Sequence, residues 1–188
     1  MKKTIAIIGV DGTGKSTLIN QLQERLGDMA VTKYMGSVRF EDPRISEYEK
    51  KESLSIVDII KIQLLIYKCF WNRYRSAVMT NKLVLFDRYV NERYINAKGK
   101  YKILNTLLYK CFFPKPSHIF YLYCTAETSL KRKDDIPDKS VFIAMKKRFD
   151  DYYLNKKNCF CLNSDVYSAE ELTEQAYKKI IKLSNGKI

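Results

Sequence analysis

The sequence of 188 residues predicts an α/β fold, in which one five-stranded parallel sheet lies between two layers of helices. Short apolar segments, rich in β-branched residues, alternate with longer segments whose apolar residues recur at helical spacing. Neighbouring parallel strands need a long crossover connection, which a helix supplies. We find no internal repeat, low-complexity tract or linker-like boundary, so we expect residues 1–188 to form a single domain.

The strands are expected where short apolar runs end at turn residues, and helices are expected in the intervals. The strands are residues 4–9, 31–35, 83–87, 118–124 and 159–163. The helices are residues 15–26, roughly 54–80, 101–112, 127–132, 140–156 and 169–183. Ser168, followed three residues later by Glu171, has the pattern of a capping box and marks the start of the last helix.

The long second helix is apolar nearly all round between residues 64 and 71. A helix of this kind is typically buried between a sheet and other elements rather than lying on the surface. We therefore interpret Tyr67, Phe70 and Trp71 as core residues, with a base-stacking platform as the alternative.

Composition limits the classes of function. The chain carries 34 Lys and Arg against 21 Asp and Glu, a formal net charge of +13 that favours anionic partners. These basic residues are spread along the whole chain without a basic tail or a recognisable nucleic-acid module, so we do not expect nucleic acid as the partner. No apolar run approaches the roughly 18–20 residues needed to span a bilayer. No signal peptide precedes the first strand, so we expect a cytoplasmic protein with no membrane partner.

The five cysteines are scattered and mostly lie inside apolar segments, as expected of small buried hydrophobes in a reducing compartment. Cys159 and Cys161 would share one face of a strand, but the chain has a single histidine, His118. Two thiols and one distant imidazole do not make a zinc site, so we interpret all three as structural.

The most informative segment is G-V-D-G-T-G-K-S-T at residues 9–17, which fits the phosphate-loop pattern G-x-x-x-x-G-K-[ST] between a strand and a helix. Its glycines allow backbone N–H groups to point at an anion, at the positive end of the following helix. Lys15 can reach the β- and γ-phosphates, and the Ser16 hydroxyl can bind Mg²⁺. We therefore expect a three-layer P-loop NTPase fold, with ATP bound by Asp11, Gly12, Thr13, Gly14, Lys15, Ser16 and Thr17.

A second group of polar residues follows the apolar strand at residues 83–87. In a phosphate-loop protein an acid at this position, here Asp87, lies beside the loop and can hold Mg²⁺ directly or through water. The neighbouring Arg88 can bind a phosphate with two parallel hydrogen bonds. The alternative for Asp87 is an ordinary turn residue at the end of a strand.

Three motifs together carry a resemblance to a known family. The phosphate loop, with an acid two residues after its first glycine, is similar to that of thymidylate kinases, and D-R-Y at residues 87–89 resembles the second motif of that family. P-K-P-S-H-I-F-Y-L at residues 114–122, followed by Ala126, Glu127 and Arg132, looks like their fourth strand and lid. These landmarks span most of the chain in the order of the family.

The resemblance implies an ATP- and Mg²⁺-dependent nucleoside monophosphate kinase of nucleotide biosynthesis, with a lid at about residues 126–140. Lys15 would stabilise the charge of the transferring phosphoryl group, and Ser16 with Asp87 would hold Mg²⁺. Asp11 would face the acceptor sugar, and Arg88 would bind the acceptor phosphate. When the acceptor is itself a phosphate, its oxygen is already anionic, so no strong general base is required.

Three further arginines are assigned by the same resemblance. Arg39 and Arg73 fall where the family places arginines of the acceptor site. Arg132, helped by Lys131 or Lys133, would close over the phosphates from the lid and complete the catalytic set with Lys15, Asp87 and Arg88; the alternative is a solvated basic helix end. The partners implied are small-molecule nucleotide substrates, and a homodimer is an open expectation because the sequence carries no signal for oligomeric state.

The segment V-N-E-R-Y-I-N-A at residues 90–97 lacks the serine and the Tyr-Gln pair with which thymidylate kinases help to read the thymine ring. The L-L-F-x-A-x-R helix of the family survives only loosely at residues 64–73. The resemblance therefore implies phosphoryl transfer more strongly than thymine recognition, and we expect dTMP to be among the acceptors.

Two kinds of alternative remain open. A kinase of nucleosides or other small metabolites would need a carboxylate base near the acceptor hydroxyl, for which Asp11 and Asp87 are the candidates. A nucleotide-gated regulatory protein or a basic nucleic-acid-binding protein would belong to another class. The Asn-Lys-x-Asp motif of guanine recognition is absent, because neither Asn81-Lys82 nor Asn155-Lys156 is followed by that aspartate.

Overall fold

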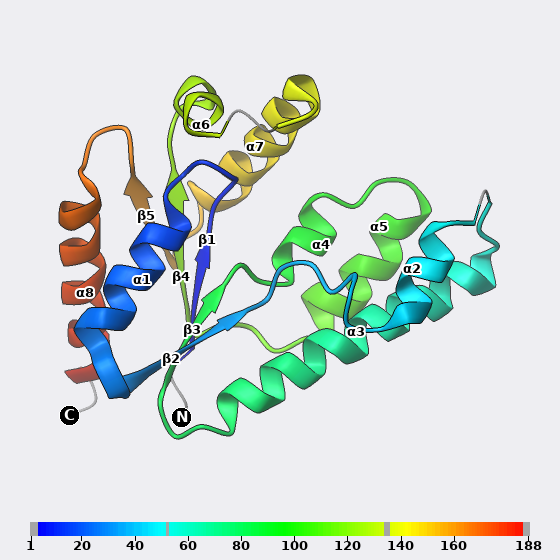
Figure 1. Cartoon of the computed structure of the whole chain (residues 1–188), viewed down its shortest axis with the longest axis horizontal. Helices are drawn as coiled ribbons and strands as arrows, with labels where there is room; N and C mark the ends of the chain where they lie inside the picture. Colours follow the sequence, from blue (N-terminus) through cyan, green and yellow to red (C-terminus); the bar gives the residue numbers. More distant parts are fainter. Residues whose placement is uncertain (1–3, 52, 134–135, 186–188) are drawn as a thin grey trace.

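The computed structural model describes residues 4–51, 53–133 and 136–185. Five parallel strands form one sheet in the order β2-β3-β1-β4-β5 (Figure 1). They are β1 (Thr4–Ile8), β2 (Ala30–Tyr34), β3 (Leu83–Asp87), β4 (His118–Tyr123) and β5 (Cys159–Asn163). Each differs from its predicted span by at most one residue at either end. The predicted α/β fold class is thus confirmed.

Helices cover both faces of the sheet (Figure 1). On one face, α1 (Lys15–Leu26) and α8 (Ala169–Asn185) pack on side chains such as Ile7 and Leu122. On the other face, α3 (Ile56–Val78) and α7 (Lys139–Tyr153) pack on Ala6 and Tyr121, which precede Ile7 and Leu122 in the same strands. Successive strand residues point to opposite faces, so each strand contributes to both cores.

The remaining segments are short. They are α2 (Pro43–Glu49), α4 (Asn91–Ile95), α5 (Lys100–Asn105), α6 (Ala126–Arg132), the 3₁₀ turn η1 (Gly27–Met29) and the π-helical segment η2 (Thr106–Cys111). Neither α2 nor α4 was predicted from the sequence. Both are too short to show helical periodicity, although Asp42, whose side chain accepts a hydrogen bond from the Arg44 N–H, and Pro43 at the first position mark the start of α2.

The long helix predicted over roughly 54–80 is confirmed within two residues at either end, whereas the helix predicted over 140–156 ends three residues earlier, at Tyr153. The long helix begins at Ile56 because Ser55 and Asp58 form a capping box, each side chain accepting a hydrogen bond from the backbone N–H of the other. The segment predicted as a single helix over 101–112 changes to π-helical geometry after Asn105, with the Phe112 N–H bonded to the Leu107 carbonyl.

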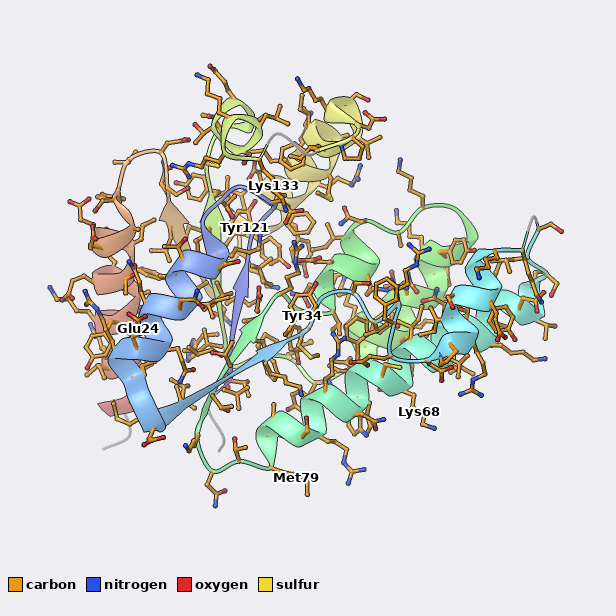
Figure 2. All side chains as sticks on the ribbon, in the orientation of Figure 1. Glu24, Tyr34, Lys68, Met79, Tyr121 and Lys133 are labelled. Carbon is orange, nitrogen blue, oxygen red and sulfur yellow. The ribbon has the colours of Figure 1, made fainter. Side chains whose placement is uncertain are left out.

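The long helix α3 is buried on one side only, which corrects the expectation that residues 64–71 are buried all round. Leu64 is 52% exposed, and Lys68 lies on the outer side of this helix (Figure 2). Phe70 is buried, and Tyr67 stacks on Trp71 at a ring-centroid distance of 6.3 Å. The core interpretation is confirmed for Phe70, whereas Tyr67 and Trp71 are partly buried and pack against the core.

Two other expectations can be compared with the structure. Cys124 is buried as expected, whereas Cys111 is exposed. Among the residues that the structure describes, none of the helices combines the length and apolar character that a membrane span requires.

Candidate active site

The phosphate loop joins β1 to α1 at the carboxyl edge of the sheet. Gly12 and Gly14 have φ values of 80° and 90°, a left-handed geometry that favours glycine. The Thr13 hydroxyl donates a hydrogen bond of 2.8 Å to the Val10 carbonyl and closes the loop. No side chain caps the N-terminus of α1, so its first backbone N–H groups stay available to an anion.

The loop is packed against α6, the first part of the predicted lid. A Cβ atom added to Gly12 would lie 2.5 Å from the Ser129 carbonyl oxygen and 2.9 Å from its Cα. At Gly14, by contrast, an added Cβ would meet no atom within 4 Å. Only glycine therefore allows the loop to approach α6 this closely at residue 12.

Lys15 is folded into the loop. Its Nζ donates a hydrogen bond of 2.8 Å to the Val10 carbonyl and lies 3.7 Å from Asp11 Oδ1, and the side chain is only 7% exposed. Burial, with the nearby Arg88 charge, lowers the pKa of Lys15 to about 8. A phosphate at this position would stabilise the charged form of the lysine.

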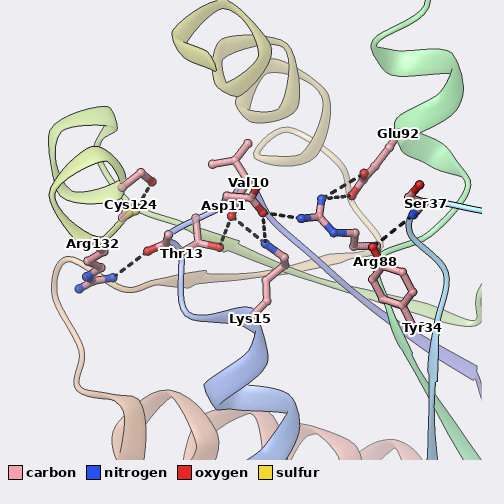
Figure 3. A network of polar contacts seen from close by, with 12 residues as sticks. Val10, Asp11, Thr13, Lys15, Tyr34, Ser37, Arg88, Glu92, Cys124 and Arg132 are labelled. Atoms are coloured by element: carbon pink, nitrogen blue, oxygen red, sulfur yellow. Dashed lines mark hydrogen bonds and ion pairs between the residues drawn. The ribbon is translucent and has the colours of Figure 1, made fainter. Parts of the chain in front are cut away.

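Arg88 lies at the centre of the polar network (Figure 3). One end of its guanidinium donates to Asp11 Oδ1, and the other lies 3.3 Å from Glu92 Oε2. Burial opposes the charge of Arg88, but Glu92 and Asp11 outweigh it and raise its pKa. Burial likewise opposes the charge of Asp11, but Arg88, Lys15 and Lys133 lower its pKa.

A cavity of about 440 Å³, which we call the phosphate cavity, opens above the loop. Ser16 and Asp87 both line it and carry hard oxygen atoms of the kind that Mg²⁺ prefers. Burial raises the pKa of Asp87, and Lys15 and Arg88 only partly oppose this. A partly buried carboxylate of this kind would gain from a bound cation, so the two residues fit the predicted metal. The lining residues are Asp11, Gly12, Gly14, Lys15, Ser16, Thr17, Tyr34, Asp87, Arg88, Arg132 and Lys133.

Arg132 reaches this cavity from the end of α6. It donates hydrogen bonds of 3.0 and 2.9 Å to Ser164 Oγ and the Ser164 carbonyl, and one of 3.5 Å to the Gly12 carbonyl. Lys133 lies over the loop (Figure 2), whereas Lys131 is exposed and paired with Glu127. The predicted lid, 126–140, includes residues 134 and 135, which lie outside the described residues.

A second cavity of about 610 Å³, which we call the acceptor cavity, lies beside the first. Arg39 lines it, as do several polar residues that were not assigned from the sequence, among them Gln63, Glu92, Arg93 and Asn105. Glu92 and Arg93 belong to helix α4, which the sequence did not predict, and Gln63 is the polar residue among the buried, otherwise apolar residues of α3. No local pattern identified them.

Arg73 lines neither cavity. It pairs with Glu41 and donates hydrogen bonds of 3.3, 3.3 and 2.9 Å to the carbonyls of Tyr34, Gly36 and Ser37. These contacts fix the loop between β2 and α2, which forms a wall of the acceptor cavity. Its role in acceptor binding stays a prediction, as do the roles of the other site residues.

Comparison with known proteins finds structures of the same fold. Thymidylate kinase from Candida albicans is 19% identical with a TM-score of 0.72, over 98% of this chain and 93% of that one. Deoxyadenosine kinase from M. mycoides with the products dCMP and dCDP bound is 16% identical with a TM-score of 0.68, over 95% and 99% of the two chains. Both are likenesses of fold.

No curated protein matches the chain. The family of AAA domains, however, matches residues 4–140, well over half of the chain. The phosphate loop, the two strands that bring Asp87 beside it and the residues predicted to form a lid, 126–140, all lie within this match. The chain therefore belongs to this family of AAA domains, with the P-loop kinase fold seen in thymidylate kinase and deoxyadenosine kinase structures.

Proposed function

We propose that this protein is an ATP-dependent kinase that transfers the γ-phosphate to a nucleoside monophosphate, with dTMP among its acceptors. One observation carries the proposal: Arg88 lines the phosphate cavity and pairs with Glu92, which lines the acceptor cavity. ATP bound in the phosphate cavity and a phosphate acceptor bound in the acceptor cavity would both contact the Arg88 guanidinium. Phosphoryl transfer depends mainly on such alignment and on neutralising charge.

Residues 11–17 would bind the phosphates of ATP, with Lys15 neutralising charge on the transferring group. Ser16 and Asp87 would hold Mg²⁺, which supplies further charge neutralisation at the phosphates when bound. Arg132 would add positive charge from the lid after leaving Ser164. Closing the lid would also exclude water and suppress hydrolysis of ATP.

The lining of the acceptor cavity supports a polar, anionic acceptor. It carries three cationic side chains, Arg39, Arg93 and Lys98, against the single carboxylate of Glu92. Arg93 Nε and Asn105 Oδ1 are buried without a hydrogen-bond partner in the described structure. Neither atom is accessible to solvent, so a nucleobase could bind to them only after the side chains around them had moved.

A kinase of unphosphorylated nucleosides is the second candidate, and Glu92 is the observation that favours it. A hydroxyl acceptor needs a base, and a partly buried carboxylate in the acceptor cavity is suited to that task. Glu92 is therefore a third candidate for the catalytic base, beside Asp11 and Asp87, which were proposed from the sequence. Structures with a similar fold include both a thymidylate kinase and a deoxyadenosine kinase, so the fold alone favours neither kind of acceptor.

Initial rates with Mg²⁺-ATP against a panel of nucleosides and nucleoside monophosphates test the proposal. We expect turnover of dTMP; turnover confined to nucleosides would favour the second candidate. Failure to bind ATP or ADP by calorimetry in the presence of Mg²⁺ would remove both. A salt-dependent shift of oligonucleotides without any kinase activity would instead support a nucleic-acid-binding protein.

We also propose a cytoplasmic homodimer that acts on small nucleotides. Sedimentation of the purified protein would test the assembly, with a single species at the mass of one chain, 22.1 kDa, counting against it.

A further inference from the structure

The guanidinium of Arg88 is shared by two carboxylates. Its Nη2 donates a hydrogen bond to Asp11, and its Nη1 lies 3.4 and 3.3 Å from the two carboxylate oxygens of Glu92. Figure 3 shows the three side chains in a row, with the arginine in the middle. One positive charge therefore faces two negative charges at the junction of the two cavities.

The two carboxylates differ in their surroundings. Asp11 belongs to the phosphate loop and has a second cation, Lys15, at 3.7 Å. Glu92 lines the acceptor cavity and has Arg88 as its ion-pair partner. An acceptor that approaches Arg88 from its own cavity consequently meets Glu92.

An ordinary surface pair would not have these properties. The pair Glu127–Lys131 has the same four-residue spacing, but its side chains are 76% and 74% exposed. Glu92 and Arg88 are 21% and 23% exposed. Charges that are partly removed from water interact more strongly, so Glu92 must influence any charged group placed beside Arg88.

We infer that Glu92 determines acceptor specificity, by competing with a phosphate-bearing acceptor for Arg88 and so favouring acceptors that end in a hydroxyl. An acceptor phosphate and the Glu92 carboxylate are like charges that need the same guanidinium. A hydroxyl acceptor meets no such repulsion. The inference rests on the proposed phosphoryl transfer, but it holds whichever acceptor the wild-type protein prefers.

Glu92→Gln tests the inference, because it removes the charge and keeps the shape and a hydrogen-bond acceptor for Arg88. The readout is the ratio of kcat/KM for dTMP to that for thymidine, at fixed Mg²⁺-ATP. We expect this ratio to rise about tenfold or more, since one neighbouring charge shifts a partly buried ionic equilibrium by about that factor. Glu92→Asp, which keeps the charge, should stay close to the wild-type ratio.

The control is Glu174→Gln on α8, where the glutamate pairs with Arg25 and Lys178 far from both cavities. It removes the same unit of charge, so it reports any general effect of net charge and should leave the ratio unchanged. Calorimetric dissociation constants of dTMP and thymidine for the four proteins provide a second measurement that does not need catalysis.

The outcomes separate the inference from the proposed function. Wild-type turnover with a ratio that moves less than twofold in Glu92→Gln overturns the inference and leaves the kinase intact. Absence of turnover removes the proposed function, while the relative affinities still decide on Glu92. If Glu92→Gln fails to fold, Glu92→Ser repeats the test. Loss of fold in both, or no binding of either ligand to any of the proteins, overturns the inference.

Discussion

Replacing Gly12 by alanine is expected to destabilise the protein more than the same change at Gly14. Both glycines have positive φ, at 80° and 90°, so both variants place a Cβ atom in a strained backbone geometry. Only at Gly12 would the new methyl group also collide with α6, 2.5 Å from the Ser129 carbonyl oxygen. The pair of variants therefore separates backbone strain from contact with α6.

The expected losses of stability can be worked out from the backbone strain, its partial offset in the unfolded chain and the collision with Ser129. Left-handed geometry costs an alanine about 1–2 kcal/mol. The smaller entropy of the unfolded chain offsets about 0.4–1 kcal/mol of that in both variants. Forcing a methyl group against the backbone of Ser129 adds about 1–3 kcal/mol for Gly12→Ala alone. For a chain of this size, 2 kcal/mol of additional destabilisation corresponds to a melting temperature lower by about 4–8 °C.

Thermal and urea unfolding of the two variants, followed by circular dichroism without ligand, measure this difference. Equal losses of stability in Gly12→Ala and Gly14→Ala would refute the reasoning, since the collision with Ser129 would then cost nothing. A larger loss at Gly14 would show that α6 does not lie against the loop in solution.

Three further predictions concern the charged groups. Lys15→Ala should lower turnover by about 100-fold or more, measured as initial rates, because a preorganised charge at the transferring phosphate is lost. The buried charge of Lys15, with its pKa lowered to about 8, costs about 3 kcal/mol of stability below pH 8. That cost disappears between pH 8 and the ordinary pKa of 10.5, so urea unfolding should show the wild type gaining stability relative to Lys15→Met across that window; parallel curves would contradict this. Arg132→Lys should lower kcat by about tenfold with a small change in melting temperature, because lysine keeps the charge but not the forked geometry; unchanged turnover would remove Arg132 from the catalytic set.

The phosphate side of the site could be predicted because its parts are close together in the sequence or in the sheet. The strand, the glycine loop and α1 follow one another directly. Asp87 lies farther along the chain, but parallel strands align their carboxyl ends, and in the structure Ile7 is paired in register with Asp87. The alignment of parallel strands was therefore sufficient to predict that Asp87 lies beside the phosphate loop.

The acceptor side could not be predicted in the same way. Its wall is assembled from α3, α4 and the loop after β2, and each contributes one or two polar residues without a local pattern. Glu92 and Arg93 lie on a helix of five residues, too short for periodicity. Arg73 resembled an acceptor residue by position, yet its hydrogen bonds to three carbonyls could be seen only after the chain had folded.

The backbone of Arg88 connects the fold to the proposed chemistry. Among the described residues it is the one non-glycine residue with positive φ, at 64°, a geometry that costs about 1–2 kcal/mol. The geometry is held from both sides, because the Arg88 N–H donates to the Ile7 carbonyl and the Asp87 carbonyl accepts from the Met35 N–H. A residue needed only for packing would gain nothing from this strain. At Arg88 the strain turns the side chain between the phosphate loop and α4, where one guanidinium can act on both a donor and an acceptor.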